Sequence, residues 1–184
     1  MASYKMNIAG VERELTLYPV NDKIDIAAFI MFSDVEITVA SAEALLNKVP
    51  DFDVIVTAEA KGIPLAYEMA RQSGKPYVVI RKSVKIYMRN SLEVEVKSIT
   101  TDKKQMLYLG EEDAQKLKGK RVLIVDDVIS TGKSVAAIEK ICEMAGGKVC
   151  CKASVLAEGD AKDREDVVYL EPLPLFMKKN QKSK

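Results

Sequence analysis

Short apolar runs alternate along most of this chain with segments whose apolar residues recur at helical spacing. The runs predict strands at residues 52–57, 77–81, 122–125, 149–156 and 167–170. Helices are predicted between them at residues 41–49, 63–73 and 135–145. Ser41 is a candidate N-cap of the first helix, and Gly74 and Gly146 stand where the other two would end. Strands that alternate with helices predict an α/β fold, with a mainly parallel central sheet and helices on both faces.

Two regions depart from this alternation. Residues 4–8 and 14–18 alternate between apolar and polar side chains on either side of Ala9 and Gly10, which predicts an amino-terminal hairpin. Residues 82–107 are mainly charged and polar, with a turn signal at 102–104. A polar stretch of this length between strong core strands favours a functional flap over packing material.

The strand predicted at residues 122–125 leads into the most informative segment of the chain, VLIVDDVISTGKS. A continuous Val/Leu/Ile run suits a strand buried on both faces, and ligands of parallel sheets bind at the carboxyl ends of such strands. Ser130, Thr131 and Gly132 can turn backbone N–H groups and hydroxyls toward an anion at the start of the next helix. This loop therefore predicts a phosphate site. Asp126 and Asp127 would repel that phosphate, so we expect them to face sugar hydroxyls or a metal.

The nucleotide P-loop, G-x-x-x-x-G-K-[ST], is the nearest alternative motif for this segment. Gly132, Lys133 and Ser134 match its last three residues, but its first glycine would fall on Asp127. Because backbone must lie against phosphate at that position, the sequence disfavours a P-loop. A core strand that ends in a solvated acidic turn is the remaining structural alternative.

The composition narrows the chemistry that is open to the chain. Its 184 residues suit one domain, and 28 basic against 27 acidic side chains leave a net charge of +1, which argues against DNA binding. The absence of histidine excludes Ser-His-Asp hydrolysis, and the three cysteines form neither a disulfide framework nor a C-x-x-C pair. No eighteen consecutive residues are apolar, so we expect a cytoplasmic protein that does not cross a membrane. The basic residues 178–184 are expected to form a disordered tail.

The segment at residues 122–134 resembles the phosphoribosyl pyrophosphate signature of the type I phosphoribosyltransferases. The resemblance implies the fold of that family for a single domain over residues 1–184, with a small hood region at 1–40 and a flexible catalytic flap at 83–107. It assigns Asp126 and Asp127 to catalysis. It also implies that the donor's 5′-phosphate is bound by Ile129, Ser130, Thr131, Gly132, Lys133 and Ser134.

A second loop, within TAEAKGIPLA at residues 57–66, looks like the pyrophosphate loop of the adenine-using branch of that family. The resemblance assigns Ala60, Lys61 and Gly62 to substrate binding, with Lys61 where the family usually has arginine. Arg81 and Lys82 end the next predicted strand, and a basic pair at this point helps to hold pyrophosphate in related enzymes.

Two further segments resemble base-handling parts of adenine phosphoribosyltransferases. The Ser-Leu-Glu sequence that ends at Glu93 is similar to their mobile loop, in which the glutamate is thought to assist proton movement at the purine; Val94 follows where a tyrosine is usual. Met31, Phe32 and Ser33 resemble part of their base pocket, with Ser33 in place of the family arginine.

The resemblance implies a purine phosphoribosyltransferase of purine salvage. Such an enzyme transfers the 5-phosphoribosyl group from phosphoribosyl pyrophosphate to a purine base, here with adenine favoured. The resemblance also implies a homodimer, and Mg²⁺ held mainly by substrate and water rather than by protein ligands. Xanthine, hypoxanthine, guanine and orotate remain alternative acceptors. A non-catalytic regulator that senses the donor, including one that binds RNA, also remains open.

Overall fold

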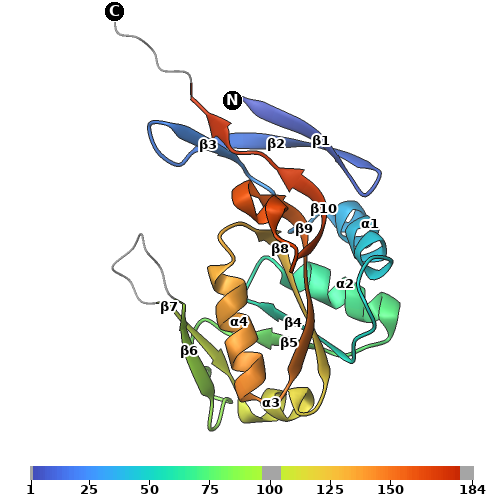
Figure 1. The fold of residues 1–184 in the computed structure, drawn as a ribbon, viewed down its shortest axis with the longest axis vertical. Coiled ribbons are helices and arrows are strands. Elements are labelled where there is room, and N and C mark those ends of the chain that lie inside the picture. Colours follow the sequence, from blue (N-terminus) through green and yellow to red (C-terminus); the bar gives the residue numbers. More distant parts are fainter. Residues whose placement is uncertain (1, 97–104, 179–184) are drawn as a thin grey trace, which may run out of the picture.

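The computed structural model describes residues 2–96 and 105–178. A five-stranded parallel sheet forms its centre, in the order β10-β9-β8-β4-β5 (Figure 1). Its strands are β4 (Val54–Ala58), β5 (Tyr77–Ile80), β8 (Arg121–Ile129), β9 (Lys148–Glu158) and β10 (Val168–Leu173). Helices α1 (Val35–Leu46) and α2 (Ile63–Ser73) pack on one face, and α4 (Lys133–Met144) packs on the other. The predicted α/β fold is confirmed.

The unbroken apolar run of β8 follows from this double coverage. Successive side chains of a strand point to opposite faces of the sheet. Val122 and Ile124 join the core under α4, whereas Leu123 and Val125 join the core under α1 and α2, and all four are fully buried. Polar alternation would have placed polar groups in one of these two cores, where they cost free energy unless they are hydrogen-bonded.

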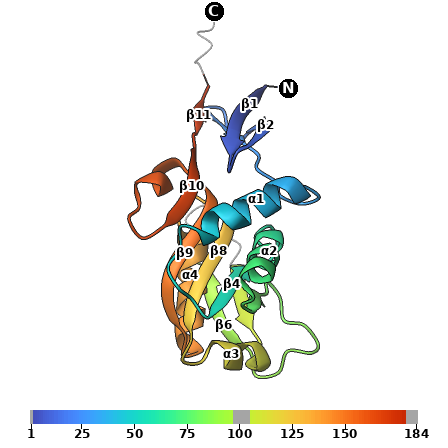
Figure 2. The same ribbon diagram turned by 90° about the vertical axis from the view of Figure 1, so that its right-hand side faces the viewer.

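A four-stranded antiparallel sheet, the hood sheet, lies at the end of the molecule where β9 passes into the short helix η1 (Gly159–Asp163) (Figures 1 and 2). Its strands are β1 (Ser3–Ile8), β2 (Val11–Pro19), β3 (Ile24–Ala27) and β11 (Phe176–Met177). β1 and β2 confirm the predicted hairpin, with Ala9 and Gly10 at positive φ in its turn. The sequence pattern did not predict β3 and β11, whose pairing joins the two ends of the chain.

Helix α1 begins earlier than the pattern predicts. Its N-cap is Asp34, whose Oδ1 accepts a hydrogen bond from the Ile37 N–H at 3.2 Å. Ser41, the predicted cap, is fully buried in the middle of the helix. The prediction was wrong because the β-branched residues Val35 and Val39, both exposed, weaken the helical pattern ahead of Ser41. Residues 35–40, which we assigned to the hood region, therefore belong to the main body.

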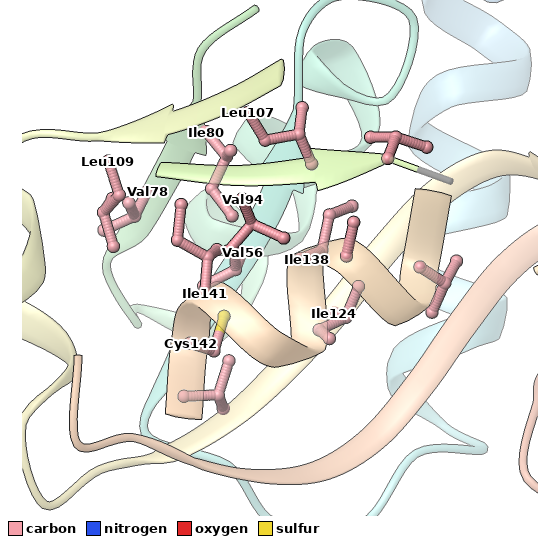
Figure 3. Packing of buried hydrophobic residues seen from close by; sticks show 14 of the residues in the cluster. Val56, Val78, Ile80, Val94, Leu107, Leu109, Ile124, Ile138, Ile141 and Cys142 are labelled. Atoms are coloured by element: carbon pink, nitrogen blue, oxygen red, sulfur yellow. The ribbon is translucent and has the colours of Figure 1, made fainter. Parts of the chain in front are cut away.

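The polar segment after β5 folds into a hairpin of β6 (Leu92–Val96) and β7 (Gln105–Leu109), followed by α3 (Glu111–Leu117). The inward side chains Val94 and Leu107 pack with Ile138 and Ile141 of α4 (Figure 3). The hairpin thus contributes to the core, which isolated apolar residues in a charged stretch did not reveal. Its predicted turn at residues 102–104 lies outside the described residues.

The carboxyl-terminal segment is placed as far as Lys178. The Nζ of this residue lies 3.1 Å from Asp25 Oδ1 and donates a hydrogen bond to the Asn21 carbonyl oxygen at 2.8 Å. Lys178 is therefore held against the hood sheet rather than disordered, and the rest of the predicted tail, residues 179–184, lies outside the described part of the chain.

None of the helices in residues 2–96 and 105–178 is long and apolar enough to cross a membrane.

Candidate active site

The strand order changes direction between β4 and β8. From β4 the chain proceeds to β5 on one side, whereas β8, β9 and β10 follow one another on the other side. Ligands of open parallel sheets bind outside the carboxyl ends of the strands at such a point. The crevice beyond the ends of β4 and β8 is therefore the expected ligand site.

A cavity of about 230 Å³ occupies this crevice, and Lys61 and Asp127 both line it. Lys61 Nζ lies 2.8 Å from Asp127 Oδ2. The Asp127 side chain is only 3% exposed, whereas that of Lys61 is 53% exposed, so a fixed carboxylate meets an amine that reaches in from solvent. This ion pair joins the loop after β4 to the carboxyl pair of the signature segment.

Asp126 precedes Asp127 on β8 and lines the same cavity. Its Oδ1 accepts a hydrogen bond from the Asp127 backbone N–H at 2.9 Å. Burial raises the pKa of Asp126 to about 8, and the charge of Asp127 adds to the rise. The raised pKa favours the protonated form of Asp126, which can donate a hydrogen bond as well as accept one.

Gly62 lies directly against this pair. A Cβ at residue 62 would overlap Thr57 Oγ1 and would lie 3.1 Å from Asp126 Oδ1 and 3.3 Å from its Cα. A glycine is therefore needed for the loop after β4 to approach β8 this closely. Ala60, on the same loop, is exposed and lines the cavity.

Arg81 and Lys82 follow β5, and both contact Glu59. Arg81 Nε lies 3.0 Å from Glu59 Oε1, and the Lys82 backbone N–H donates to Glu59 Oε2 at 2.8 Å. Lys82 and Glu59 also line the cavity. Sequence reasoning missed Glu59 as a site residue. The only hint in the sequence was that an acidic residue stands two positions before Lys61 in a loop expected to bind anions.

The predicted phosphate loop connects β8 to α4. Gly132 is buried, has a φ of 72° in the left-handed region and is the N-cap of the helix. Ser130 and Thr131 are exposed ahead of it, while Lys133 and Ser134 form the start of α4, and Ser134 lines the cavity. The positive end of α4 favours an anion at this loop.

Ten of the predicted binding residues do not line this cavity: Gly62, Arg81, Ile129, Ser130, Thr131, Gly132, Lys133, Met31, Phe32 and Ser33. Ile129 is 2% exposed and packs in the core under α4. Met31 is 1% exposed and belongs to the core under α1 and α2, and Ser33 lines a separate hollow beside these helices. Phe32 is 47% exposed. Within the ranges that the structure describes, no hydrogen bond or ion pair joins Met31, Phe32 or Ser33 to the carboxyl pair.

Glu93 does not reach the carboxyl pair in this conformation. On β6, Val94 and Val96 point into the core, so Glu93 lies on the opposite, exposed face of the hairpin. Its cross-strand partner is Tyr108. The hairpin side chains that line the cavity include Val96 and Leu107. A catalytic role of Glu93 stays a prediction that requires the hairpin to move.

A further carboxyl group, that of Glu158, stands at this edge of the sheet at the end of β9. The preceding residue, Ala157, pairs with Ile129 at the end of β8. Burial raises the pKa of Glu158, and the charge of Lys61 opposes the rise. Sequence reasoning missed Glu158, although an acid just after a predicted strand was a usable signal.

Comparison with known proteins places this geometry in a family. A family model described as "Phosphoribosyl transferase domain" matches residues 35–174, which include the carboxyl pair and both loops that the sequence predicts to bind anions. The chain belongs to the phosphoribosyltransferase family. The match begins at the first residue of α1, so strands β1 to β3 of the hood sheet lie ahead of it.

Relatives in this family are named for different purine bases. The hypoxanthine/guanine phosphoribosyltransferase of Methanococcus voltae is 41% identical over 114 residues, which are 62% of this chain and 57% of that protein. The adenine phosphoribosyltransferase of Thermotoga petrophila is 34% identical over 122 residues, which are 66% of this chain and 64% of that protein. The chain therefore spans less than two thirds of the length of either relative.

A solved structure shares the phosphoribosyltransferase fold over most of the chain. The crystal structure of adenine phosphoribosyltransferase from Thermoanaerobacter pseudethanolicus has a TM-score of 0.72 and 25% sequence identity, over 86% of this chain and 95% of that one. This similarity confirms the type I phosphoribosyltransferase fold that the signature segment predicted.

Proposed function

We propose that the chain is a purine phosphoribosyltransferase, which transfers the 5-phosphoribosyl group of phosphoribosyl pyrophosphate to a ring nitrogen of a purine base. The observation that carries this proposal is the meeting of Lys61 with Asp127 in one cavity beside the loop that begins α4. The donor presents a pyrophosphate, ribose hydroxyls and a 5′-phosphate. A cation, a carboxyl pair and a helix N-terminus suit these three groups in that order.

The charges of the site are paired with one another before the donor arrives. Lys61 is held by Asp127, and Arg81 is held by Glu59. A pyrophosphate carries more negative charge than one carboxylate, and the half-exposed Lys61 side chain can turn toward it. Because this exchange releases Asp127, donor binding itself frees the carboxylate for the ribose.

Displacement of pyrophosphate builds positive charge on the ribose ring, as in other glycosyl transfers. Asp127 is buried and fixed, so its negative charge would stabilise this state with little reorganisation. Asp126, whose raised pKa favours the protonated form, would donate or accept a hydrogen bond at a neighbouring ribose hydroxyl. The two adjacent carboxyl groups therefore take different parts in the same step.

Magnesium fits this site as an ion that arrives with the substrate. In the part of the chain that the structure describes, no three His, Cys, Asp or Glu side chains are grouped to hold a metal. Mg²⁺ would be held mainly by substrate oxygens and water, and the carboxylate of Asp127 offers an oxygen of the kind that this ion prefers beside them. When bound, the ion would neutralise part of the pyrophosphate charge, which Lys61 and Arg81 do not balance alone.

Adenine is the acceptor that we propose. The likeness of the loop at residues 57–66 to the adenine-using branch supports it, as does the fold shared with the Thermoanaerobacter enzyme. Hypoxanthine or guanine is the alternative, because the Methanococcus relative is named for these bases.

A base screen tests this function. The protein is incubated with Mg²⁺, phosphoribosyl pyrophosphate and one base at a time, and pyrophosphate release is measured. We expect release with adenine to exceed release with hypoxanthine, guanine, xanthine or orotate at least tenfold. Pyrophosphate release with a 6-oxopurine alone would change the proposed acceptor. If the protein binds the donor but releases pyrophosphate with none of the bases, the proposal that it is an enzyme is refuted.

Replacing Glu93 by alanine is expected to lower kcat at least tenfold, about 1.4 kcal/mol in the barrier, and to leave donor affinity within twofold. The reason is that the resemblance assigns Glu93 to the purine rather than to the donor. Its side chain is exposed on the hairpin, so its loss should not disturb the core. Steady-state kinetics and donor titration measure the two quantities. Glu95→Ala, on the same face of β6, is the matched control and should leave both unchanged. A loss confined to donor affinity would contradict the role of Glu93.

A further inference from the structure

Arg164, between η1 and β10, lies against the phosphate loop. A Cβ built on Gly132 would overlap Arg164 Nη1 and would lie 3.0 Å from its Cζ. Gly132 is buried and has a positive φ, so the glycine at this position accommodates both the turn and the guanidinium.

The guanidinium is held from its other side by Asp166. Arg164 Nε and Nη2 donate to the two carboxylate oxygens of Asp166 at 2.9 Å and 2.7 Å. This bidentate pairing uses two of the three guanidinium nitrogens and leaves Nη1 directed at Gly132. The same contact keeps the pKa of Asp166 well below its usual range, so its charge persists at any pH at which the protein would be assayed.

Asp166 is in turn tied to the helix that follows the phosphate loop. Lys152 Nζ, from β9, lies 3.1 Å from Asp166 Oδ2 and 2.8 Å from Glu139 Oε2 on α4. The Lys152 side chain is only 14% exposed, so solvent screens these pairs less than it would at the surface. Four side chains of alternating charge therefore connect Gly132 to the body of α4.

The segment from Ser130 to Gly132 offers N–H groups and hydroxyls but has no charged side chain of its own, and Lys133 follows it at the start of α4. A phosphate binds more tightly where a cation stands beside such donors, because opposite charges attract one another. The Arg164 guanidinium lies at this loop and fills the space beside residue 132.

We propose that Arg164 is a positioning residue of the 5′-phosphate subsite. Its locked guanidinium holds the backbone at Gly132 in the shape that binds phosphate and adds positive charge to that subsite. The inference rests on the proposed function only in taking this loop as the place of the donor's 5′-phosphate.

Binding measurements that need no turnover test this role. Titration calorimetry gives the affinities of the protein for ribose 5-phosphate and for pyrophosphate. Arg164→Met should weaken ribose 5-phosphate binding at least tenfold and change pyrophosphate binding less than twofold, and Arg164→Lys should recover part of the loss. Arg121→Met is the matched control. Arg121 also forms a bidentate pair, with Asp53, but at the opposite end of β8, so neither affinity should change.

Several outcomes would overturn the inference. These are an unchanged ribose 5-phosphate affinity in Arg164→Met, equal loss of both affinities, or no ribose 5-phosphate binding by the unaltered protein. If Arg164→Met does not fold, Asp166→Asn loosens the guanidinium without removing it and should give a smaller loss in the same direction; no loss there would also overturn it. Selective weakening by Arg164→Met in a protein that turns over no base would support the inference and refute the proposed enzyme.

Discussion

Replacing Asp127 by asparagine is expected to lower kcat at least tenfold, which corresponds to about 1.4 kcal/mol in the barrier. Asparagine keeps the shape of the side chain and one acceptor oxygen but loses the negative charge that faces the developing cation. Because the Asp127 side chain is 3% exposed, water cannot replace that charge. Lys61 loses its partner but is 53% exposed and remains solvated, so the protein should still fold. Pyrophosphate release at saturating donor and base measures the effect.

Asp53→Asn is the matched control for this substitution. Asp53 forms an ion pair with Arg121, as Asp127 does with Lys61. It directly precedes β4, however, so it lies at the amino ends of the strands, whereas the cavity lies at their carboxyl ends. Its replacement should leave kcat within twofold. Equal falls in the two variants would mean that lost stability, rather than lost charge, explains the result. An unchanged kcat in Asp127→Asn would show that this carboxylate does not face the reacting ribose.

The central sheet and the signature loop can be predicted from sequence because their information is local. The run Val122 to Val125 has no polar residue, and a strand of that kind is stable only when both faces are covered. Gly74 ends α2 with a φ of 70°, a conformation that glycine adopts readily. Each of these signals depends on a few neighbouring residues, so the fold class follows without knowledge of any distant contact.

Other elements depend on contacts that no local pattern encodes. β11 is two residues long and exists because Phe176 and Met177 pair with β3, some 150 positions away in the chain. The β6–β7 hairpin looks like a solvated flap because its buried residues Val94 and Val96 alternate with glutamates. That alternation is what a strand with one face on the core requires, but it resembles a polar loop when few residues are considered at once.

The same limit applies to the site. The sequence placed Lys61 and Asp127 at the ends of strands on one edge of a sheet, and their meeting follows from that topology. The topology does not predict that Glu59 pairs with Arg81 or that Arg164 packs against Gly132. A charged loop residue has many possible partners, so local sequence does not identify the right one. The assignment of Met31 to Ser33 to the base rested on resemblance alone, and these residues do not line the cavity that the carboxyl pair lines.

Replacing Asp126 by asparagine is expected to change how stability depends on pH. The folded chain holds the Asp126 proton up to a pKa of about 8, whereas the unfolded chain releases it near pH 4. Between these values the folded state binds more protons, so the free energy of unfolding of the unaltered protein falls as pH rises. Asparagine has no proton to lose. From pH 5 to pH 8 the stability of the variant should therefore rise relative to the unaltered protein by more than about 1.4 kcal/mol, the value of one pKa unit.

Urea unfolding at several pH values measures this difference. Few other groups of the chain change their charge between pH 5 and pH 8. The chain has no histidine, burial raises the pKa of Cys142 to about 12, and the raised pKa of Glu158 affects both proteins alike. Asp53→Asn is again the control: its pairing with Arg121 lowers the pKa of Asp53 to about 2, so its effect should not vary from pH 5 to pH 8. Parallel stability curves for Asp126→Asn and the unaltered protein would refute the raised pKa. A variant that is more stable at pH 8 but turns over more slowly would show that the buried carboxyl group serves the reaction at the expense of the fold.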